Sequence, residues 1–302
     1  MLKTFEHTDF PVAALLAERT GRVSVVIPTR STAGTIAHTV SEIEVLADAG
    51  LVGQILVVDA DSPDGTAAAA RDAGAEVISE NDLAPGLGPV RGKGDAMWRS
   101  LEAVRGELVV FVDGDVADFG RHYVTGLLGP LIRDPAVQFV KGSYRRPFRQ
   151  EGSEQPAGGG RVTELTARPL LRQMVPELTC FDQPLAGEIA ARRDLLDRVP
   201  FTTGYGVEIA MLVDVWDRVG LEAMAQVALG TKRNTHQTLA ALGGMASEVV
   251  TSLGQAVSRI DRPGTGALRP ADGLATELEI RPSRVRSGAP ESLSGALGPP
   301  GQ

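Results

Sequence analysis

Short apolar runs and stretches of helical spacing alternate along the first part of the chain. The runs are rich in Val, Ile and Leu and have the composition of buried strands, which we expect at residues 23–27, 54–59, 75–78 and 108–112. Apolar side chains between them recur at helical spacing and predict helices at 35–49, 66–73 and 95–104. This alternation favours right-handed crossovers, so we predict an α/β fold, with a Rossmann-like, mostly parallel sheet and helices on both faces.

The second part of the chain continues with less regular runs. We expect a helix at about 121–133, strands at 137–141 and 224–229, a strand or buried turn at 185–191, and a helix from 239 to about 260. No internal repeat is visible in this pattern.

The ends of the chain and of its first strand carry their own signals. Pro28 is expected to end the first strand, because proline has no amide proton for a central ladder. Residues 1–21 are expected to be a leader with one helix at Val12–Arg19. Pro, Gly, Ser and Arg dominate residues 261–302 without a period, which predicts a disordered tail or a linker.

Two carboxylates follow the strand at 108–112 at once, in the sequence Asp113-Gly114-Asp115. Open α/β sheets bind their ligands at the carboxyl ends of the strands. Two aspartates one residue apart can bind a hard divalent cation, which normally also takes phosphate oxygens, and a glycine lets a ligand come close. An Asp-Gly-Asp surface turn would give the same sequence. The pattern leaves a cation site and a plain turn open.

A long polar segment, residues 79–94, contains Lys93 between two glycines just ahead of a predicted helix. The segment is too long for an ordinary connection, which favours a functional loop. A lysine at a helix amino terminus is a phosphate anchor, although the spacing is not that of a nucleotide-triphosphatase loop. A flexible, solvated lysine is the alternative.

Two further segments carry groups that suit an anion. Arg145 and Arg146 are adjacent, and three glycines precede Arg161 and Thr163 at the start of a predicted helix. Backbone amides, a hydroxyl and a guanidinium in this order suit a phosphate or carboxylate. The glycines would equally suit a hinge.

Three other polar residues stand out in the second part of the chain. Glu188 falls inside the apolar run at 185–191. Glu208 opens an apolar helix, where it is either an ordinary first-turn acid or a carboxylate placed beside a sugar. His236 lies in a polar loop, and a single histidine is weak evidence for a metal ligand.

Composition narrows the class of partner. The net charge of -8 over 302 residues leaves no basic surplus for phosphate neutralisation, which argues against nucleic-acid binding and favours a small molecule. Cys180 is the one cysteine, so no internal disulfide can form. No apolar run approaches the roughly 20 residues of a membrane helix, and we expect a cytoplasmic protein without a membrane span.

The ordered motifs together resemble a known family. Residues 23–250 are similar to the retaining, GT-A-type glycosyltransferases that make glucosyl-3-phosphoglycerate, a family that also holds mannosyl-3-phosphoglycerate synthases. The motifs that carry the resemblance are Pro89–Leu101, Val112–Asp115, Val140–Pro147, Gly158–Leu165, Gly204–Ile209 and Leu242–Met245. The resemblance implies a GT-A fold and glucose transfer from UDP-glucose to 3-phosphoglycerate, with GDP-mannose as the alternative donor. It also implies a nucleotide-sugar-binding half at 22–150 and an acceptor-binding half at 151–260.

The resemblance also assigns roles to individual residues. It implies catalytic roles for Asp113, Asp115, Glu208 and Lys93, and donor contacts at Pro28, Thr29, Thr32, Ser62, Lys93, Asp113, Gly114, Tyr205 and Glu208. It implies acceptor contacts at Gly160, Arg161, Val162, Thr163 and Asn234, and Mg²⁺ or Mn²⁺ bound by Asp115 and His236. It further implies a cytoplasmic homodimer whose product serves compatible solutes or methylglucose lipopolysaccharide.

Two departures from the family pattern bear on these roles. The family often carries an acid in the loop after the first strand, where this chain has Arg30, Ser31 and Thr32, and the identity of the nucleotide base stays open. Asn234 and His236 stand in the reverse of the family order. We favour His236 as the metal ligand because imidazole is the better donor for Mn²⁺, with Asn234 as the alternative.

Two other functions share a nucleotide-binding α/β sheet. A sugar-phosphate nucleotidyltransferase would show a glycine-rich, basic loop directly after the first strand, and residues 28–34 hold one arginine and one glycine. A non-catalytic nucleotide-sugar-binding protein would not need Asp113, Asp115, Lys93 and Arg161 together. Both rank below the transferase.

Overall fold

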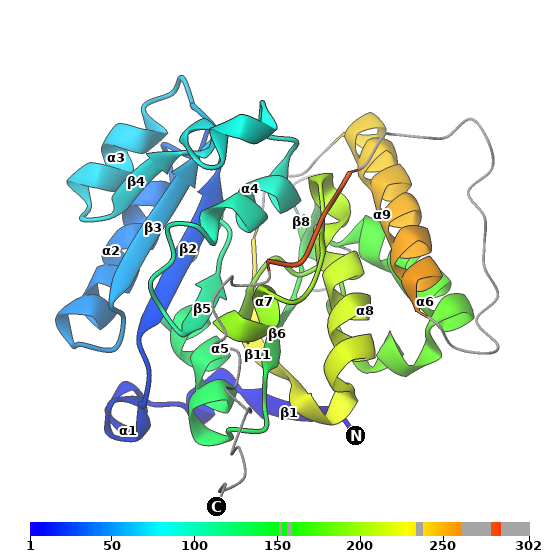
Figure 1. Ribbon diagram of the computed structural model, residues 1–302, viewed down its shortest axis with the longest axis horizontal. Coiled ribbons are helices and arrows are strands. Elements are labelled where there is room, and N and C mark those ends of the chain that lie inside the picture. Colours follow the sequence, from blue (N-terminus) through cyan, green and yellow to red (C-terminus); the bar gives the residue numbers. More distant parts are fainter. Residues whose placement is uncertain (151–152, 156–158, 234–237, 261–278, 285–302) are drawn as a thin grey trace, which may run out of the picture.

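The structure is a computed structural model that describes residues 1–150, 153–155, 159–233, 238–260 and 279–284. A central sheet separates two layers of helices (Figure 1). The helices of the part described are α1 (Val12–Glu18), α2 (Ile36–Asp48), α3 (Thr66–Asp72), α4 (Lys93–Ser100), α5 (His122–Arg133), α6 (Arg168–Met174), α7 (Arg193–Leu196), α8 (Val207–Val219) and α9 (Leu239–Arg259).

Among the described residues, eight strands form the main sheet, in the order β1-β11-β6-β9-β5-β2-β3-β4. They are β1 (Lys3–Glu6), β2 (Val23–Thr29), β3 (Gln54–Asp59), β4 (Glu76–Ser79), β5 (Leu108–Phe111), β6 (Phe139–Arg145), β9 (Ile189–Arg192) and β11 (Met224–Thr231). Neighbours pair in parallel except β9, which is antiparallel to β5 and β6. The strand order reverses between β2 and β5, which is where open α/β sheets bind ligands.

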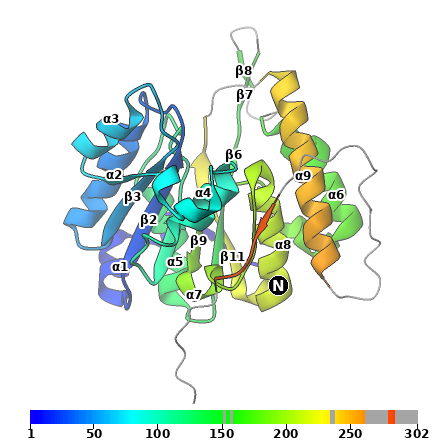
Figure 2. The ribbon, with the colours of Figure 1, turned by 45° about the horizontal axis from the view of Figure 1, so that its top comes forward.

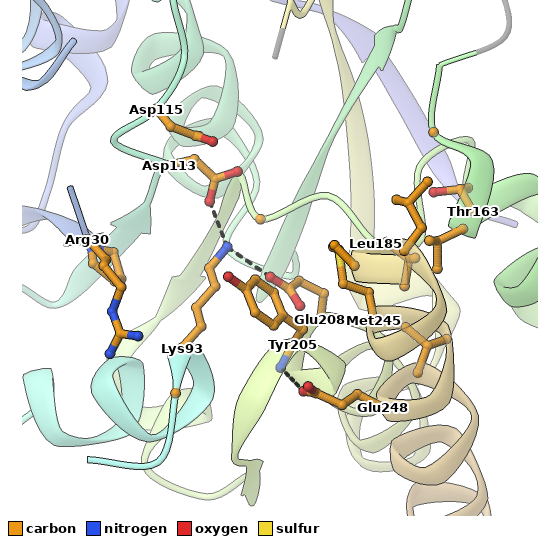
Figure 3. A pocket seen from close by; sticks show the side chains of 18 of the residues that line it. Arg30, Lys93, Asp113, Asp115, Thr163, Leu185, Tyr205, Glu208, Met245 and Glu248 are labelled. Atoms are coloured by element: carbon orange, nitrogen blue, oxygen red, sulfur yellow. Dashed lines mark hydrogen bonds and ion pairs between the residues drawn. The ribbon is translucent and has the colours of Figure 1, made fainter. Parts of the chain in front are cut away.

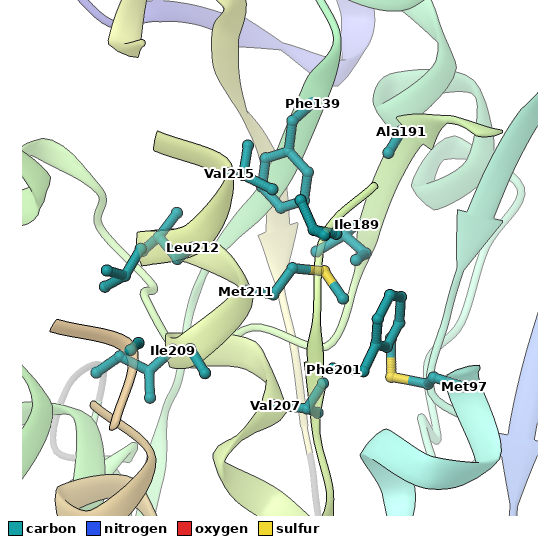
Figure 4. Close-up of a cluster of buried hydrophobic side chains, with 14 of the residues drawn as sticks. Met97, Phe139, Ile189, Ala191, Phe201, Val207, Ile209, Met211, Leu212 and Val215 are labelled. Carbon is teal, nitrogen blue, oxygen red and sulfur yellow. The ribbon is translucent and has the colours of Figure 1, made fainter. Parts of the chain in front are cut away.

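Apolar side chains cover both faces of the sheet. One core cluster joins the sheet to α1, α2, α3 and α5, and the other joins it to α4, α6, α8 and α9. Figure 4 shows part of the second cluster, where Met211 of α8 lies near Phe139 of β6 and Ile189 of β9. Each such buried side chain contributes about 1.5–3 kcal/mol. The helices therefore hold the strand ends in place from both sides, as the alternating pattern predicted.

Two small ribbons and several short turns complete the fold. A hairpin of β7 (Phe148–Gln150) and β8 (Ser153–Gln155) stands out beyond the sheet in Figure 2, and β10 (Phe201–Thr202) pairs with β12 (Ile280–Arg281). Turns of 3₁₀ type lie at His7–Asp9, Glu80–Asp82, Pro85–Leu87, Pro176–Cys180, Gly204–Gly206 and Leu221–Ala223, and a π-helical stretch, Thr163–Ala167, leads into α6. No helix in the part described is long and apolar enough to cross a membrane.

The amino-terminal segment is part of the sheet and not only a leader. The helix predicted at Val12–Arg19 is found as α1, but residues 3–6 also form β1, which pairs in parallel with β11. Lys3 pairs with Ala225 and Phe5 with Val227. The pattern missed this strand because it is four residues long, at the sheet edge, and only partly buried.

The first strand continues through Pro28, so the prediction that this proline ends it was wrong. Pro28 pairs with Val58 and Thr29 with Asp59 on the β3 side. On the other side the pairing with β5 stops at Val26. A proline is tolerated here because one side of β2 has no ladder left to complete.

The composition of residues 261–302 predicted a disordered tail or a linker. Part of this segment is instead ordered on the fold. Residues 279–284 pack on the fold, while 261–278 and 285–302 lie outside the described residues. Phe201 pairs with Arg281 in the β10–β12 ribbon, and the Trp98 indole donates to the Pro282 carbonyl at 2.9 Å. The guanidinium of Arg284 lies 3.9 Å from the centre of the Trp98 ring. The sequence of residues 261–302 has no hydrophobic periodicity, so it did not predict that residues 279–284 pack against Trp98 and β10.

Candidate active site

A pocket of about 600 Å³ opens at the carboxyl ends of β2 and β5, between α4, α8 and α9 (Figure 3). It brings together residues that were predicted from segments far apart in the chain. The predicted site residues that line it are Pro28, Thr29, Thr32, Lys93, Asp113, Gly114, Asp115, Gly160, Arg161, Val162, Thr163, Tyr205 and Glu208.

Three predicted site residues are not among those that line the pocket. Ser62 lies beside it, where its hydroxyl accepts a hydrogen bond from the Ser31 amide at 2.8 Å. Asn234 and His236 lie outside the described residues, so both metal-ligand alternatives stay predictions.

Asp113 lies between two lysines at the centre of the pocket. Its carboxylate accepts from Lys93 Nζ at 2.6 Å and from Lys232 Nζ at 2.7 Å. Lys93 also lies 2.9 Å from Glu208 Oε1, and Lys232 also donates to Glu188. Figure 3 shows Lys93 reaching from α4 to both Asp113 and Glu208. Five charged groups from five segments thus form one chain of ion pairs.

The pKa values of this chain follow from its charges. Burial alone would raise the pKa of Asp113, but Lys232 and Lys93 hold it well below its usual range. Burial would lower the pKa of both lysines, yet Asp113 keeps each well above its usual value, aided by Glu208 at Lys93 and by Glu188 at Lys232. Asp113 is therefore a fixed negative charge and a poor proton acceptor.

Lys232 and Gly187 are pocket-lining positions that the sequence did not single out. Lys232 directly follows β11, so the rule that picked Asp113 after β5 could have found it. At Gly187, a Cβ would lie 2.5 Å from both Asp113 Oδ1 and Lys93 Nζ. The glycine is required by close approach of the backbone to the ion pair.

Asp115 differs from Asp113 because its carboxylate is exposed to the pocket and makes no hydrogen bond or ion pair with the described part of the chain. No group of three or more His, Cys, Asp or Glu side chains in that part could hold a metal by itself. An accessible carboxylate with few protein neighbours fits Mg²⁺ or Mn²⁺, which keeps waters and takes substrate phosphate oxygens. The donor set at Asp115 is compatible with such an ion.

The end of the pocket near β3 and β4 is lined by polar groups. Glu80 is buried there, 3.9 Å from Arg30, and burial raises its pKa although Arg30 opposes the shift. Next to it, the Thr29 and Thr32 hydroxyls share a hydrogen bond. A Cβ at Gly114 would lie 2.8 Å from the Thr29 hydroxyl, so only glycine fits between the two loops. The sequence named Arg30 as a departure but missed Glu80.

The opposite wall is formed by the start of the helical stretch at 161–174 and by the end of β6. Arg161, Val162 and Thr163 open this stretch, and their amides belong to its first turn, which has no intrahelical partners for them. Gly160 ahead of them has a φ of +75°, which suits glycine. Arg146, half-buried, lies beside these glycines.

Tyr205 stands at the pocket mouth with about half of its surface exposed. It lies in the turn Gly204–Gly206 before α8, and its amide donates to Glu248 of α9 at 2.7 Å (Figure 3). A Cβ at Gly206 would lie 1.8 Å from the Ser252 hydroxyl. This turn therefore packs directly on α9, which fixes Tyr205 and Glu208 relative to the pocket.

A second ion cluster lies behind the pocket. Asp95 accepts from Arg99 and from both Nε and Nη2 of Arg281, at 2.7 and 2.9 Å for Arg281. Arg99 in turn donates to the carbonyls of Leu83 at 3.0 Å and Gly88 at 2.8 Å. The cluster ties the long segment at 79–92 to α4, whose first residue is Lys93.

Comparisons with known proteins bear directly on this site. The model of the family described as glycosyl transferase family 2 matches residues 24–181. A glucosyl-3-phosphoglycerate synthase of Mycolicibacterium smegmatis is 45% identical over 251 residues, which are 83% of this chain and 82% of that protein. The chain belongs to glycosyl transferase family 2 and, within it, to the glucosyl-3-phosphoglycerate synthase family. The resemblance stated from the sequence motifs is confirmed.

Solved structures of this family confirm the fold. Two of them are synthases of 3-phosphoglycerate glycosides. A mannosyl-3-phosphoglycerate synthase of Rubrobacter xylanophilus is 42% identical with a TM-score of 0.81, over 93% of this chain and 96% of that one. A glucosyl-3-phosphoglycerate synthase of Mycobacterium tuberculosis, solved with Mn²⁺, UDP-glucose and phosphoglyceric acid, is 40% identical with a TM-score of 0.80, over 94% and 98%. The same enzyme has also been solved with Mg²⁺ and UDP.

Proposed function

We propose that the protein transfers glucose from UDP-glucose to the 2-hydroxyl of 3-phosphoglycerate, with retention of the anomeric configuration. The observation that carries the proposal is that one pocket joins Asp113 and Asp115, Lys93, and the segment Gly160–Thr163. These are the motifs that the family uses for the metal and donor and for the acceptor. The relatives bound to UDP-glucose, phosphoglyceric acid and Mn²⁺ support the same pair of substrates.

The strand ends divide the pocket between the two substrates in this proposal. The nucleotide sugar lies against residues 22–150, with Thr29, Thr32 and Gly114 at the nucleotide and Ser62 beside it. The acceptor lies against residues 151–260, where Gly160–Thr163 binds its phosphate. Tyr205 and Glu208 lie between them, beside the transferred sugar. The two halves would meet at Asp113 and Lys93, at the point where the strand order reverses.

The side chains contribute position and charge to the reaction. Asp113 is held by two lysines and cannot take a proton near neutral pH, so the acceptor hydroxyl proton passes to the leaving phosphate of the donor. The bond from C1 to that phosphate breaks while the bond from C1 to the acceptor oxygen forms on the same face. Lys93 fixes Asp113 and Glu208 around the sugar, which lowers the barrier through preorganised charge.

Asp115 would hold Mg²⁺ or Mn²⁺ together with the donor diphosphate, with His236 or Asn234 as a further ligand. Such an ion supplies Lewis-acid neutralisation of the departing nucleoside diphosphate. The carboxylate of Asp115, which is exposed and has no ion-pair partner among the described residues, supports this assignment.

Mannosyl transfer from GDP-mannose is the second candidate. It is favoured by two observations, the 42% identity with a mannosyl-3-phosphoglycerate synthase and the altered loop at Arg30 to Thr32, where the family's acid is missing. Both candidates keep the fold, the acceptor and the metal site.

The oligomeric state, location and role of the product complete the proposal. We propose a cytoplasmic homodimer, on the support of the family resemblance and of the finding that no helix in the described part could cross a membrane. Its product would serve compatible solutes or methylglucose lipopolysaccharide.

Product formation from 3-phosphoglycerate tests the proposal, with UDP-glucose and GDP-mannose in parallel and with Mg²⁺, Mn²⁺ or a chelator. A metal-dependent glucosyl product is expected, and a mannosyl product would select the second candidate. Asp115→Ala is expected to remove metal-dependent turnover, whereas Asp72→Ala, the same change at an exposed position on α3, should leave it intact. Wild-type turnover by Asp115→Ala would show that the metal assignment is wrong.

A further inference from the structure

Arg146 lines the pocket but has no part in the roles given above. It is one of two adjacent arginines at the end of β6, and the two differ in placement. Arg145 is exposed and pairs with Thr231 of β11, whereas Arg146 is half-buried. Successive residues of an extended segment point to opposite sides, which is why only one of the two lines the pocket.

The Arg146 side chain packs against the Tyr144 ring and close to Gly159. Its guanidinium carbon lies 5.5 Å from the centre of the Tyr144 ring, within the range of a cation–π contact. A Cβ at Gly159 would lie 2.8 Å from the Cβ of Arg146. The glycines before Arg161 are therefore needed for the close approach of Arg146, a requirement that differs from the hinge considered from the sequence.

Gly160 shows where the head of Arg146 lies relative to the acceptor segment. A Cβ at position 160 would lie 3.3 Å from Arg146 Cδ and 3.8 Å from its Nη1, and also 3.8 Å from Thr163 Cβ. Arg146 and Thr163 thus approach one point from two segments.

The charge of a phosphate group suits this point. The pocket lysines are engaged in ion pairs, Lys93 with Asp113 and Glu208, and Lys232 with Asp113 and Glu188. A phosphate monoester carries about 1.5 to 2 negative charges at neutral pH. Two guanidinium groups match that charge better than one, and each can bind phosphate oxygens in a bidentate way.

We propose that Arg146 binds the acceptor's phosphate group together with Arg161 and Thr163, and so selects a phosphorylated acceptor over its unphosphorylated counterpart. The inference rests on the proposed function and goes beyond it, because Arg146 is outside the acceptor contacts that the family resemblance implies.

Steady-state kinetics of four proteins test the inference: wild type, Arg146→Gln, Arg146→Lys and, as matched control, Arg145→Gln. Loss of a charge-assisted contact in Arg146→Gln is expected to raise KM for 3-phosphoglycerate about 10- to 100-fold. KM for UDP-glucose should change less than about 2-fold, because the head of Arg146 lies at the glycines before Arg161 and not at the nucleotide end of the pocket. Arg146→Lys keeps the charge without the planar fork and should fall between wild type and Arg146→Gln.

Inhibition by acceptor fragments separates the two ends of 3-phosphoglycerate. Glycerol 3-phosphate keeps the phosphate and glycerate keeps the carboxylate. Arg146→Gln should weaken inhibition by glycerol 3-phosphate and leave that by glycerate unchanged. The reverse pattern, or an Arg146→Gln variant that behaves like Arg145→Gln, would overturn the inference. Equal melting temperatures of the four proteins would exclude a folding effect.

Calorimetric binding of 3-phosphoglycerate keeps the inference apart from the proposed function. If wild type transfers no sugar, the proposed function fails. Binding that is still weakened by Arg146→Gln and not by Arg145→Gln would uphold the phosphate contact, and equal binding by both would refute it.

Discussion

Asp95 and Asp113 are both carboxylates held between two cations, but their partners differ in kind. Asp95 is buried with Arg99 and Arg281, away from the pocket, and Asp113 faces the pocket between Lys93 and Lys232. A guanidinium has a planar fork with several donors, and an ammonium is a compact point charge.

The arginine cluster organises the chain because its spare donors reach backbone carbonyls. Arg99 alone binds carbonyls of Leu83 and Gly88 in addition to Asp95. Within the described part of the chain, the ammonium groups of Lys93 and Lys232 donate to carboxylates and not to backbone carbonyls. The comparison indicates that the arginine cluster determines where the pocket wall lies. The lysine cluster determines the electrostatic field inside the pocket.

Removal of the negative charge from the lysine cluster, with the side-chain shape kept, should give the largest effect on activity. Asp113→Asn is expected to lower kcat/KM on the order of 10³-fold, because the fixed charge beside the sugar is lost. The free energy of unfolding should fall by less than in the arginine cluster, since Lys93 keeps Glu208 and Lys232 keeps Glu188. Kinetics and thermal unfolding on the same preparation check both statements. A large drop in melting temperature with normal turnover would contradict the comparison.

The same exchange in the arginine cluster should have the opposite result. Asp95→Asn leaves the buried Arg99 guanidinium without its acidic partner and Arg281 with the more exposed Glu279 alone, and is expected to lower the free energy of unfolding by about 3–5 kcal/mol. Denaturant unfolding measures this loss. Turnover per folded molecule should stay within about 3-fold of wild type, because Asp95 touches no substrate in the proposed site. A normal unfolding curve with lost turnover would place Asp95 with Asp113.

Another buried cation, Lys141, sharpens the comparison through the pH dependence of stability. Its ammonium donates to the Ala186 carbonyl at 2.8 Å, and burial lowers its pKa to about 8. Unfolded lysine has a pKa of about 10.4, so between these values the unfolded state binds more protons and stability rises with pH. Below pH 8 the full cost remains. Lys141→Met should therefore be more stable than wild type near pH 7, by up to about 3 kcal/mol, and lose that advantage above pH 10.

Unfolding of wild type and Lys141→Met over pH 6 to 10.5 measures this difference. The difference cancels most other titrating groups, which are common to both proteins. A constant difference over the whole range would show that Lys141 titrates normally.

The smallest effect is expected from a change of cation type at Arg281. Arg281→Lys keeps the charge but loses the two-pronged contact with Asp95, and we expect a loss of about 1–2 kcal/mol in the free energy of unfolding. KM and kcat should not change. An unaltered unfolding midpoint would show that charge alone, and not the fork, stabilises the cluster.

Much of the donor side of the site was predictable because it follows a local rule. Strands β2, β3 and β5 are continuous apolar runs, and polar residues directly after them meet at one sheet edge. This is how Asp113 came to be named, whereas Thr29 was implied by the family resemblance. The same rule applied to β11 would have found Lys232, which directly follows this strand. The sequence pattern singled out His236 in the same loop instead.

The remaining features depend on contacts between segments that no local pattern reports. Asp95 lies four residues from Arg99 and could be paired with it on one helix face, but its bond to Arg281 joins segments 186 residues apart. Glu188 and Gly187 lie in the crossing from the pocket to the antiparallel strand β9, whose direction the run at 185–191 did not reveal. The edge strand β1 carried too little apolar surface to be seen.

The long separation between Asp95 and Arg281 has a consequence for synthesis. A growing chain is synthesised from its amino terminus at about 5–20 residues per second, so the segment at 79–92 and α4 emerge well before residue 281. Until then Asp95 has Arg99 but lacks its second guanidinium, and β10 lacks its partner strand. The wall that carries Lys93 therefore reaches its final form only after residues 279–284 have emerged from the ribosome.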